Sequence, residues 1–161
     1  DLYDHKLTLV MDNAKRLRVA DKISTQKMDA TTVHEHFAPD SFDKILVDAP
    51  CSGIGLIRRK PDIKYNKENQ DFSALQEIQL QILDSVCQTL RKGGIITYST
   101  CTIFDEENFQ VIHKFLETHP NFEQVKLSHT QEDIVRDGCI TITPEQYQTD
   151  GFFIGQVKRI L

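Results

Sequence analysis

Several signals that assign a chain to a common class are missing from this sequence. No run of about eighteen or more apolar residues occurs, so no segment is expected to cross a membrane as a helix. The first residues are charged and resemble the interior of a domain, so no signal peptide is expected either. The four cysteines form no CxxC pair and have no histidine at zinc-finger spacing, so no metal site is expected. A cytoplasmic protein with reduced thiols is the simplest interpretation.

Common nucleotide-binding and hydrolase motifs are also missing. Gly53-Ile54-Gly55 lacks the third glycine of the dinucleotide-binding fingerprint, and no phosphate-loop GK[ST] is present. The serine-nucleophile pattern GxSxG does not occur. His34, His36 and His113 show no metal-binding spacing and are interpreted as surface or packing residues.

Basic residues are too few to coat the chain, whose formal net charge is −5. Non-specific affinity for nucleic acid comes mainly from neutralising phosphates, which normally requires a basic surface. Arg58-Arg59-Lys60 and Lys64 form a local basic cluster. Any contact with RNA is therefore expected to be focused there or to come from another part of the protein.

Apolar residues repeat in a pattern that predicts alternating helices and strands in a single domain. Amphipathic helices are expected over residues 4–18, 71–90 and 105–118, and strands over 23–26, 44–47, 94–98, 139–143 and 151–158. Lys92-Gly93-Gly94 is a typical stop signal for the second helix. This alternation indicates an α/β fold with a sheet that is parallel in its main part.

Polar and reactive residues follow three of the predicted strands. In sheets of this kind ligands bind at the carboxyl ends of the strands. Asp29, the segment Asp48-Ala-Pro-Cys51 and Thr100-Cys101 all lie where strands are expected to end. We therefore expect these three segments to meet in one crevice.

Two of the four cysteines stand out by their context. Cys51 lies in Val47-Asp48-Ala49-Pro50-Cys51-Ser52-Gly53, where proline restricts the backbone before the thiol and glycine permits a tight loop after it. Cys101 lies in Tyr98-Ser99-Thr100-Cys101-Thr102. Each thiol follows an apolar strand and precedes a hydroxyl residue, whereas Cys87 and Cys139 are interpreted as inert buried side chains.

Two acidic residues have two interpretations each. Asp1 could accept hydrogen bonds from ribose hydroxyls, and Asp29 could bind an adenine amino group, if each follows a strand of a nucleotide-binding sheet. Alternatively, each caps a helix or lies in a solvated turn.

The motifs together resemble those of the RNA cytosine-5 methyltransferases. Asp48-Ala-Pro-Cys51-Ser-Gly resembles the family's proline-cysteine motif, and Ser99-Thr-Cys101 its threonine-cysteine motif. Arg58-Arg-Lys-Pro61-Asp-Ile-Lys-Tyr65 and Thr149-Asp-Gly151-Phe-Phe153 resemble further blocks in the same order. The closest resemblance is to the bacterial Sun/RsmB branch, which methylates small-subunit ribosomal RNA.

This resemblance implies a fold and a domain assignment. The fold is a Rossmann-like class I S-adenosylmethionine-dependent methyltransferase sheet, truncated at its N-terminal side. Residues 1–161 would be the C-terminal portion of the catalytic domain, without the glycine-rich cofactor loop and the upstream RNA-binding domain. The isolated segment is therefore expected to bind the cofactor weakly and to be inactive.

The resemblance also assigns roles to residues. Cys101 would attack C6 of the cytosine, Asp48 would hold the base and contact the cofactor, and Cys51 would help the product leave. S-adenosylmethionine would be the methyl donor, with Asp1 at its ribose and Asp29 at its adenine. Arg58, Lys60 and Pro50 would contact the RNA substrate, and no metal or membrane would take part.

Three other functions compete with this one. A catalytically silent RNA-binding or assembly module would be expected to lose at least one of Cys51 and Cys101, yet both are present. A cysteine hydrolase would need a histidine that the fold brings near, and no local signature supports one. Methyltransferases of adenine or exocyclic amines have an aromatic residue where this chain has Cys51, so this function is disfavoured.

Overall fold

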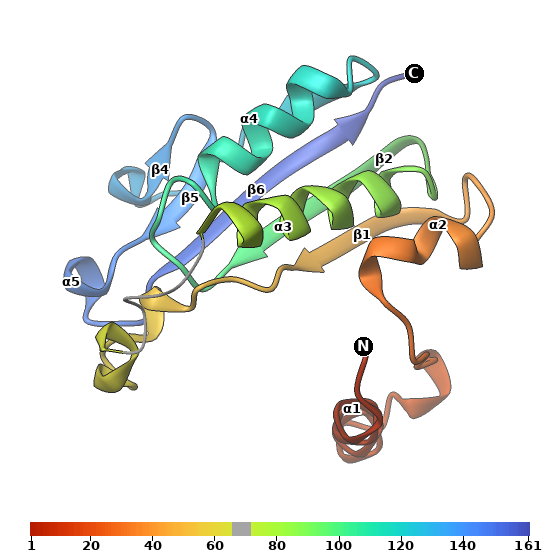
Figure 1. Ribbon diagram of the computed structural model, residues 1–161, viewed down its shortest axis with the longest axis horizontal. Coiled ribbons are helices and arrows are strands. Elements are labelled where there is room, and N and C mark those ends of the chain that lie inside the picture. Colours follow the sequence, from red (N-terminus) through yellow and green to blue (C-terminus); the bar gives the residue numbers. More distant parts are fainter. Residues whose placement is uncertain (66–71) are drawn as a thin grey trace.

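A computed structural model describes residues 1–65 and 72–161 (Figure 1). The α-helices are α1 (Asp4–Arg16), α2 (Val33–His36), α3 (Phe72–Cys87), α4 (Phe109–Thr118) and α5 (Pro144–Tyr147). The strands are β1 (Phe42–Asp48), β2 (Leu90–Thr100), β3 (Phe122–Val125), β4 (Val135–Arg136), β5 (Cys139–Ile142) and β6 (Phe152–Arg159). None of the helices in these two ranges is long and apolar enough to cross a bilayer.

The strands form one six-stranded sheet in the order β1-β2-β6-β5-β4, with β3 also paired to β6. The mixed α/β, Rossmann-like class predicted from the sequence is confirmed. The prediction that the sheet is parallel in its main part is wrong for the described strands: β1 and β2 are parallel, and the other four pairs are antiparallel. The reason is the insertion of β6, which pairs with β2 on one side and with β3 and β5 on the other, and runs against all three.

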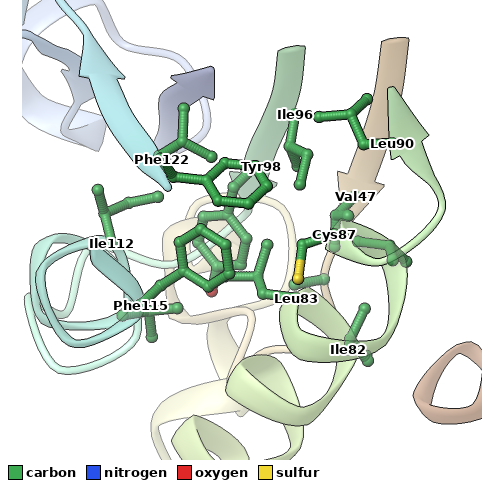
Figure 2. Close-up of a cluster of buried hydrophobic side chains, with 14 of the residues drawn as sticks. Val47, Ile82, Leu83, Cys87, Leu90, Ile96, Tyr98, Ile112, Phe115 and Phe122 are labelled. Atoms are coloured by element: carbon green, nitrogen blue, oxygen red, sulfur yellow. The ribbon is translucent and has the colours of Figure 1, made fainter. Parts of the chain in front are cut away.

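The core lies between one face of the sheet and helices α3 and α4, which cross that face side by side (Figure 1). Figure 2 shows Leu83 and Phe115 from these helices packed near Ile96 and Tyr98 of β2. In β6, alternate residues are buried, as expected when one face of a strand packs on helices and the other meets solvent. Each fully buried large apolar side chain stabilises the fold by roughly 1.5–3 kcal/mol.

All three predicted helices are shorter in the structure, and α1 ends at Arg16, two residues before its predicted end. Helix α3 ends at Cys87, and β2 already begins at Leu90, so Lys92-Gly93-Gly94 lies within that strand. The predicted first residue of α3, Asp71, lies outside the described residues. Helix α4 begins at Phe109, because residues 105–108 form a turn whose last side chain, that of Asn108, bonds to the end of β2.

The N-terminal segment stands apart from the sheet. Helix α1 confirms the first predicted helix, and Figure 1 shows it beyond the β1 edge. The strand predicted at residues 23–26 is wrong, since these residues have no strand partner. Instead, Met28 N–H donates to the Asp1 carbonyl oxygen (3.0 Å) and the Asp1 backbone nitrogen donates to the Gln26 carbonyl oxygen (3.2 Å). Two such bonds do not make a strand ladder.

Candidate active site

The two cysteines of interest lie side by side. The Sγ atoms of Cys51 and Cys101 are 3.4 Å apart, although the residues are 50 positions apart in the chain. Strands β1 and β2 are parallel, and Asp48 is paired with Ser99, so both strands end at the same sheet edge. Ala49 N–H donates to the Ser99 carbonyl oxygen (2.9 Å), which extends this pairing to the start of the Cys51 loop. The predicted meeting of these two strand ends is therefore confirmed. The third predicted strand end, at Asp29, is wrong, because no strand precedes Asp29, which caps a short 3-10 helix instead.

The environment of Cys51 favours its protonated form. Burial, followed by repulsion from Cys101 and the hydrogen bond with it, raises the pKa of Cys51 to about 12. Each of these causes acts against the charged thiolate form of Cys51.

Replacing Cys101 with alanine should lower the pKa of Cys51. Two of the three causes that raise it come from Cys101, whereas burial, the largest cause, remains. The pKa of Cys51 should therefore fall but stay above the ordinary thiol value. The pH dependence of iodoacetamide alkylation, followed at Cys51 by mass spectrometry, measures this. An unchanged or higher pKa would show that Cys101 does not act on Cys51 in this way.

Asp48 lies at the rim of an open pocket of about 440 Å³ beside β1. Its carboxylate accepts a hydrogen bond from Ser99 Oγ (3.2 Å) and is exposed. Pro50 lines the same pocket, as does Ala30, the residue after Asp29. The rest of the lining is mainly apolar, with Val33, Ile82 and Val86 among its residues. An apolar pocket with a carboxylate at its rim suits a ligand that carries both a flat ring and hydroxyl or amino groups.

The side chains of Asp1 and Asp29 are occupied locally. Asp29 Oδ1 accepts hydrogen bonds from Thr31 N–H (2.9 Å) and Thr31 Oγ1 (2.8 Å), which lower the pKa of Asp29. Asp1 Oδ1 accepts a hydrogen bond from Tyr3 N–H (3.0 Å). Both carboxylates therefore have the capping contacts of the alternative interpretation. Among the described residues neither bonds to the loops of Cys51 or Cys101.

Close backbone contacts join three of the sequence blocks. Gly55 N–H donates to the Cys101 carbonyl oxygen (3.0 Å), and Gly151 N–H donates to the Gly55 carbonyl oxygen (2.7 Å). A Cβ atom on Gly55 would lie 2.7 Å from the Cys101 oxygen, so only glycine fits there. These hydrogen bonds link the loop after Cys51 both to Cys101 and to the segment that contains Gly151.

The basic cluster Arg58-Arg59-Lys60 lies in the segment that follows Cys51. Arg59 forms an ion pair with Asp150, with a distance of 3.1 Å from Nε to Oδ1. Arg58 and Lys60 are exposed and make no ion pair with the residues that the structure describes. These two cations remain available to an anionic ligand.

Comparisons with known proteins identify the family of this chain. A family model described as 16S rRNA methyltransferase RsmB/F matches residues 1–158. The chain belongs to this family. The resemblance to the Sun/RsmB branch is thereby confirmed.

One sequence relative and two solved structures illustrate the family and the fold. The probable ribosomal RNA small subunit methyltransferase B of Bacillus subtilis (strain 168) is 45% identical over 164 residues, which cover 99% of this chain and 36% of the relative. The crystal structure of PH0851 has a TM-score of 0.91 at 28% identity, over 99% of this chain and 36% of that one. NSun6 from Pyrococcus horikoshii, solved with SFG, has a TM-score of 0.78 at 24% identity, over 100% and 40%. The chain spans about a third of the length of its relatives, as the 36% coverage shows.

Three buried polar residues of this RsmB/F family member were missed by the sequence analysis. Gln79, Glu107 and Asn108 are almost fully buried and bond to the two loops that carry the thiols. A signal was present: each falls on the apolar stripe of its predicted helix, Gln79 four residues before Leu83 and Asn108 four before Ile112. In the described part of the chain, no group of three or more histidine, cysteine or acidic side chains could hold a metal ion.

Proposed function

We propose that the protein transfers a methyl group from S-adenosylmethionine to C5 of a cytosine in RNA, through a covalent bond between Cys101 and C6. The observation that carries this proposal is the 3.4 Å contact between two thiols at the ends of adjacent parallel strands. The family description and the name of the Bacillus subtilis relative make small-subunit 16S ribosomal RNA the proposed substrate. The assignment of residues 1–161 to the C-terminal portion of the catalytic domain stays a prediction.

The two thiols take different steps. C5 of cytosine is a weak nucleophile, and addition of the Cys101 thiolate at C6 makes C5 electron-rich, like an enamine. Once C5 carries the methyl group and S-adenosylhomocysteine has left, a base takes the C5 proton and the C5=C6 double bond re-forms. The electron pair of the C6–S bond then returns to Cys101, which releases the product. C5 and C6 are bonded neighbours, so a second thiol beside the first is in reach of the same ring. We assign Cys51 to this release step, as the resemblance to the RNA cytosine-5 methyltransferases implies, because its thiol lies beside that of Cys101.

Asp48 stabilises the attacked ring. Its carboxylate is exposed beside the thiol loop and is oriented by Ser99 Oγ. A carboxylate there can accept a hydrogen bond from the amino edge of the cytosine as charge develops in the ring. Pro50, also exposed next to Cys51, would contact the same base.

The pocket beside Asp48 fits the methyl donor. S-adenosylmethionine supplies an electrophilic methyl group, and its adenosine has a flat ring with amino and hydroxyl groups. The apolar lining suits the ring, and Asp48 at the rim can accept a hydrogen bond. Asp29, next to the lining residue Ala30, is proposed at the adenine and Asp1 at the ribose. The SFG in the P. horikoshii NSun6 structure is an analogue of this donor.

Removing Arg58 and Lys60 together should weaken RNA binding and flatten its salt dependence. Each cation that contacts a phosphate contributes about 0.7–0.9 to the slope of log affinity against log salt. The Arg58→Gln/Lys60→Gln double variant should therefore lose roughly one to two units of slope. Arg59→Gln is the matched control, since Arg59 is held by Asp150. Filter binding at several salt concentrations measures this, and equal slopes for all three proteins would remove Arg58 and Lys60 from the interface.

Product analysis tests the reaction itself. The full-length protein is incubated with methyl-labelled S-adenosylmethionine and unmodified small-subunit ribosomal RNA, and the RNA is digested to nucleosides. The expected labelled product is 5-methylcytidine. Label on the exocyclic amine would reassign the reaction, and RNA binding without any methylation would favour a silent binding module.

A further inference from the structure

We propose that the consecutive residues Glu107 and Asn108 are positioning residues that set the distance between the Cys51 and Cys101 thiols. The inference rests on the proposed function, because it concerns the same pair of thiols. It adds residues that act through their hydrogen bonds to the two loops that carry the thiols.

Glu107 and Gln79 hold the Cys51 loop on both sides of the thiol. Glu107 Oε1 accepts a hydrogen bond from Ser52 N–H (2.7 Å), in the peptide unit after Cys51. Gln79 Nε2 donates to the Pro50 carbonyl oxygen (2.9 Å), in the peptide unit before it. Gln79 Nε2 also donates to Glu107 Oε1 (3.3 Å), which links these two side chains to each other. Both peptide units of Cys51 are thus fixed to buried side chains.

Asn108 holds the Cys101 turn in the same way. Its Oδ1 accepts a hydrogen bond from Thr100 Oγ1 (2.5 Å), and its Nδ2 donates to the Thr102 carbonyl oxygen (3.0 Å). A single amide therefore bridges the residues before and after Cys101. The two loops are also joined directly, by the 2.9 Å hydrogen bond between Ser52 Oγ and Thr102 Oγ1.

The peptide that links Glu107 to Asn108 is itself anchored. The phenol of Tyr98, a fully buried residue of β2, donates to the Glu107 carbonyl oxygen (2.6 Å). Because Glu107 and Asn108 are adjacent, one anchored peptide fixes both the Cys51 loop and the Cys101 turn. Any shift of this peptide would move the two loops together and preserve the distance between the thiols.

Stability alone does not account for these residues. Glu107 is 0% exposed and Asn108 is 1% exposed. Burying polar groups costs free energy unless every group is hydrogen-bonded. Glu107 Oε2 and Gln79 Oε1 are buried without a hydrogen-bond partner among the described residues. These side chains therefore carry a cost in buried polar atoms, and what they supply in return is hydrogen bonds to the backbones of the two loops.

The test uses variants of the full-length protein, each of which removes a hydrogen-bonding group that contacts one of the two loops. Asn108→Asp keeps the acceptor for Thr100 but loses the donor to Thr102. Gln79→Met keeps the side-chain size but loses the donor to Pro50, and it leaves no unpartnered polar atom of its own. Glu107→Ala removes the acceptor for Ser52, and Glu107→Gln restores an acceptor oxygen. Val157→Ala, in the core on β6, is the control for lost stability.

The first measurement follows the thiols without methyl transfer. Each protein is equilibrated with reduced and oxidised glutathione, and the Cys51–Cys101 disulfide is quantified by mass spectrometry. One glutathione disulfide accepts the two electrons and is reduced to two thiols as the two protein thiols join. The equilibrium gives the effective concentration of one thiol at the other. We expect it to fall about tenfold in Asn108→Asp, Gln79→Met and Glu107→Ala, and to stay near wild type in Glu107→Gln and Val157→Ala.

The second measurement is the kinetics of methyl transfer. In the first three variants kcat should fall by about tenfold or more, with KM for RNA unchanged, because misplacing reacting groups slows chemistry. Unchanged effective concentration in the folded variants Asn108→Asp and Gln79→Met would overturn the inference, and so would an equal loss in Val157→Ala. Absence of methylation by the wild type would instead refute the proposed function and leave the glutathione measurement readable.

Discussion

Replacing Cys101 with alanine is expected to reduce methyl transfer by on the order of 10³-fold or more. Without the thiol no bond forms at C6, and C5 of the cytosine stays a weak nucleophile. RNA binding should change little, because the basic residues of the 58–60 segment are untouched. Initial rates of methyl incorporation into small-subunit ribosomal RNA, measured beside RNA affinity, check this.

Cys87→Ala is the matched control for loss of a thiol. Cys87 is buried at the end of α3, in the hydrophobic core. Its replacement should lower stability slightly and leave the rate per folded molecule near that of the wild type. Comparable rates for Cys101→Ala and Cys87→Ala would contradict a covalent mechanism through Cys101.

Replacing Gly55 with alanine is expected to lower the stability of the protein, although it adds only one methyl group. The new Cβ would lie 2.7 Å from the Cys101 carbonyl oxygen and still closer to that of Gly151. Both are backbone atoms in loops held by hydrogen bonds, so neither can move away freely. Overpacking of this kind costs roughly 1–3 kcal/mol, which lowers the Tm of a domain of this size by about 3–10 °C. Differential scanning calorimetry measures this Tm.

The activity of Gly55→Ala should fall with its stability, because Gly55 N–H donates to the Cys101 carbonyl oxygen. The control is Gly93→Asn, at a position where an added Cβ meets nothing within 4 Å. Gly93 has a φ of +78°, a conformation that asparagine tolerates better than most residues. Its Tm should fall less than that of Gly55→Ala, because only the backbone conformation and no close contact opposes the new side chain. A Gly55→Ala protein as stable as Gly93→Asn would show that the contact between these loops is loose.

The thiol pair could be predicted from the sequence because the same local pattern, an apolar strand followed by a cysteine motif, occurs twice. Both β1 and β2 are apolar runs that end in a short polar motif with a cysteine. Parallel neighbouring strands carry such ends to the same sheet edge, so two independent motifs implied one site. The helices α1, α3 and α4 were found for a similar reason, since their apolar residues recur at helical spacing.

Whether the later strands run parallel or antiparallel could not be predicted from such local patterns. Strand β6 reads like any buried strand, and nothing in its composition shows that it enters antiparallel beside β2. The segment at 23–26 has strand-like residues, but it lies where the described sheet offers no partner. Pairing is a tertiary property, and local propensity does not decide it.

The supporting polar residues were missed because sequence analysis searched strand ends for reactive groups. Glu107 and Asn108 lie in the turn before α4, and the contact of Glu107 with Ser52 joins residues that are 55 positions apart in the chain. Asp1 and Asp29 show the opposite difficulty. Their capping contacts arise within three residues, so the local interpretation holds whatever ligand they bind.

Trapping of a protein–RNA adduct tests the proposed division of work most directly. Full-length wild type, Cys51→Ala and Cys101→Ala are incubated with S-adenosylmethionine and small-subunit ribosomal RNA, denatured, and separated by electrophoresis. The predicted result is an adduct that resists denaturation, accumulates in Cys51→Ala and is absent in Cys101→Ala. An adduct that is lost with Cys51→Ala and persists in Cys101→Ala would contradict the assignment of Cys101 as the nucleophile.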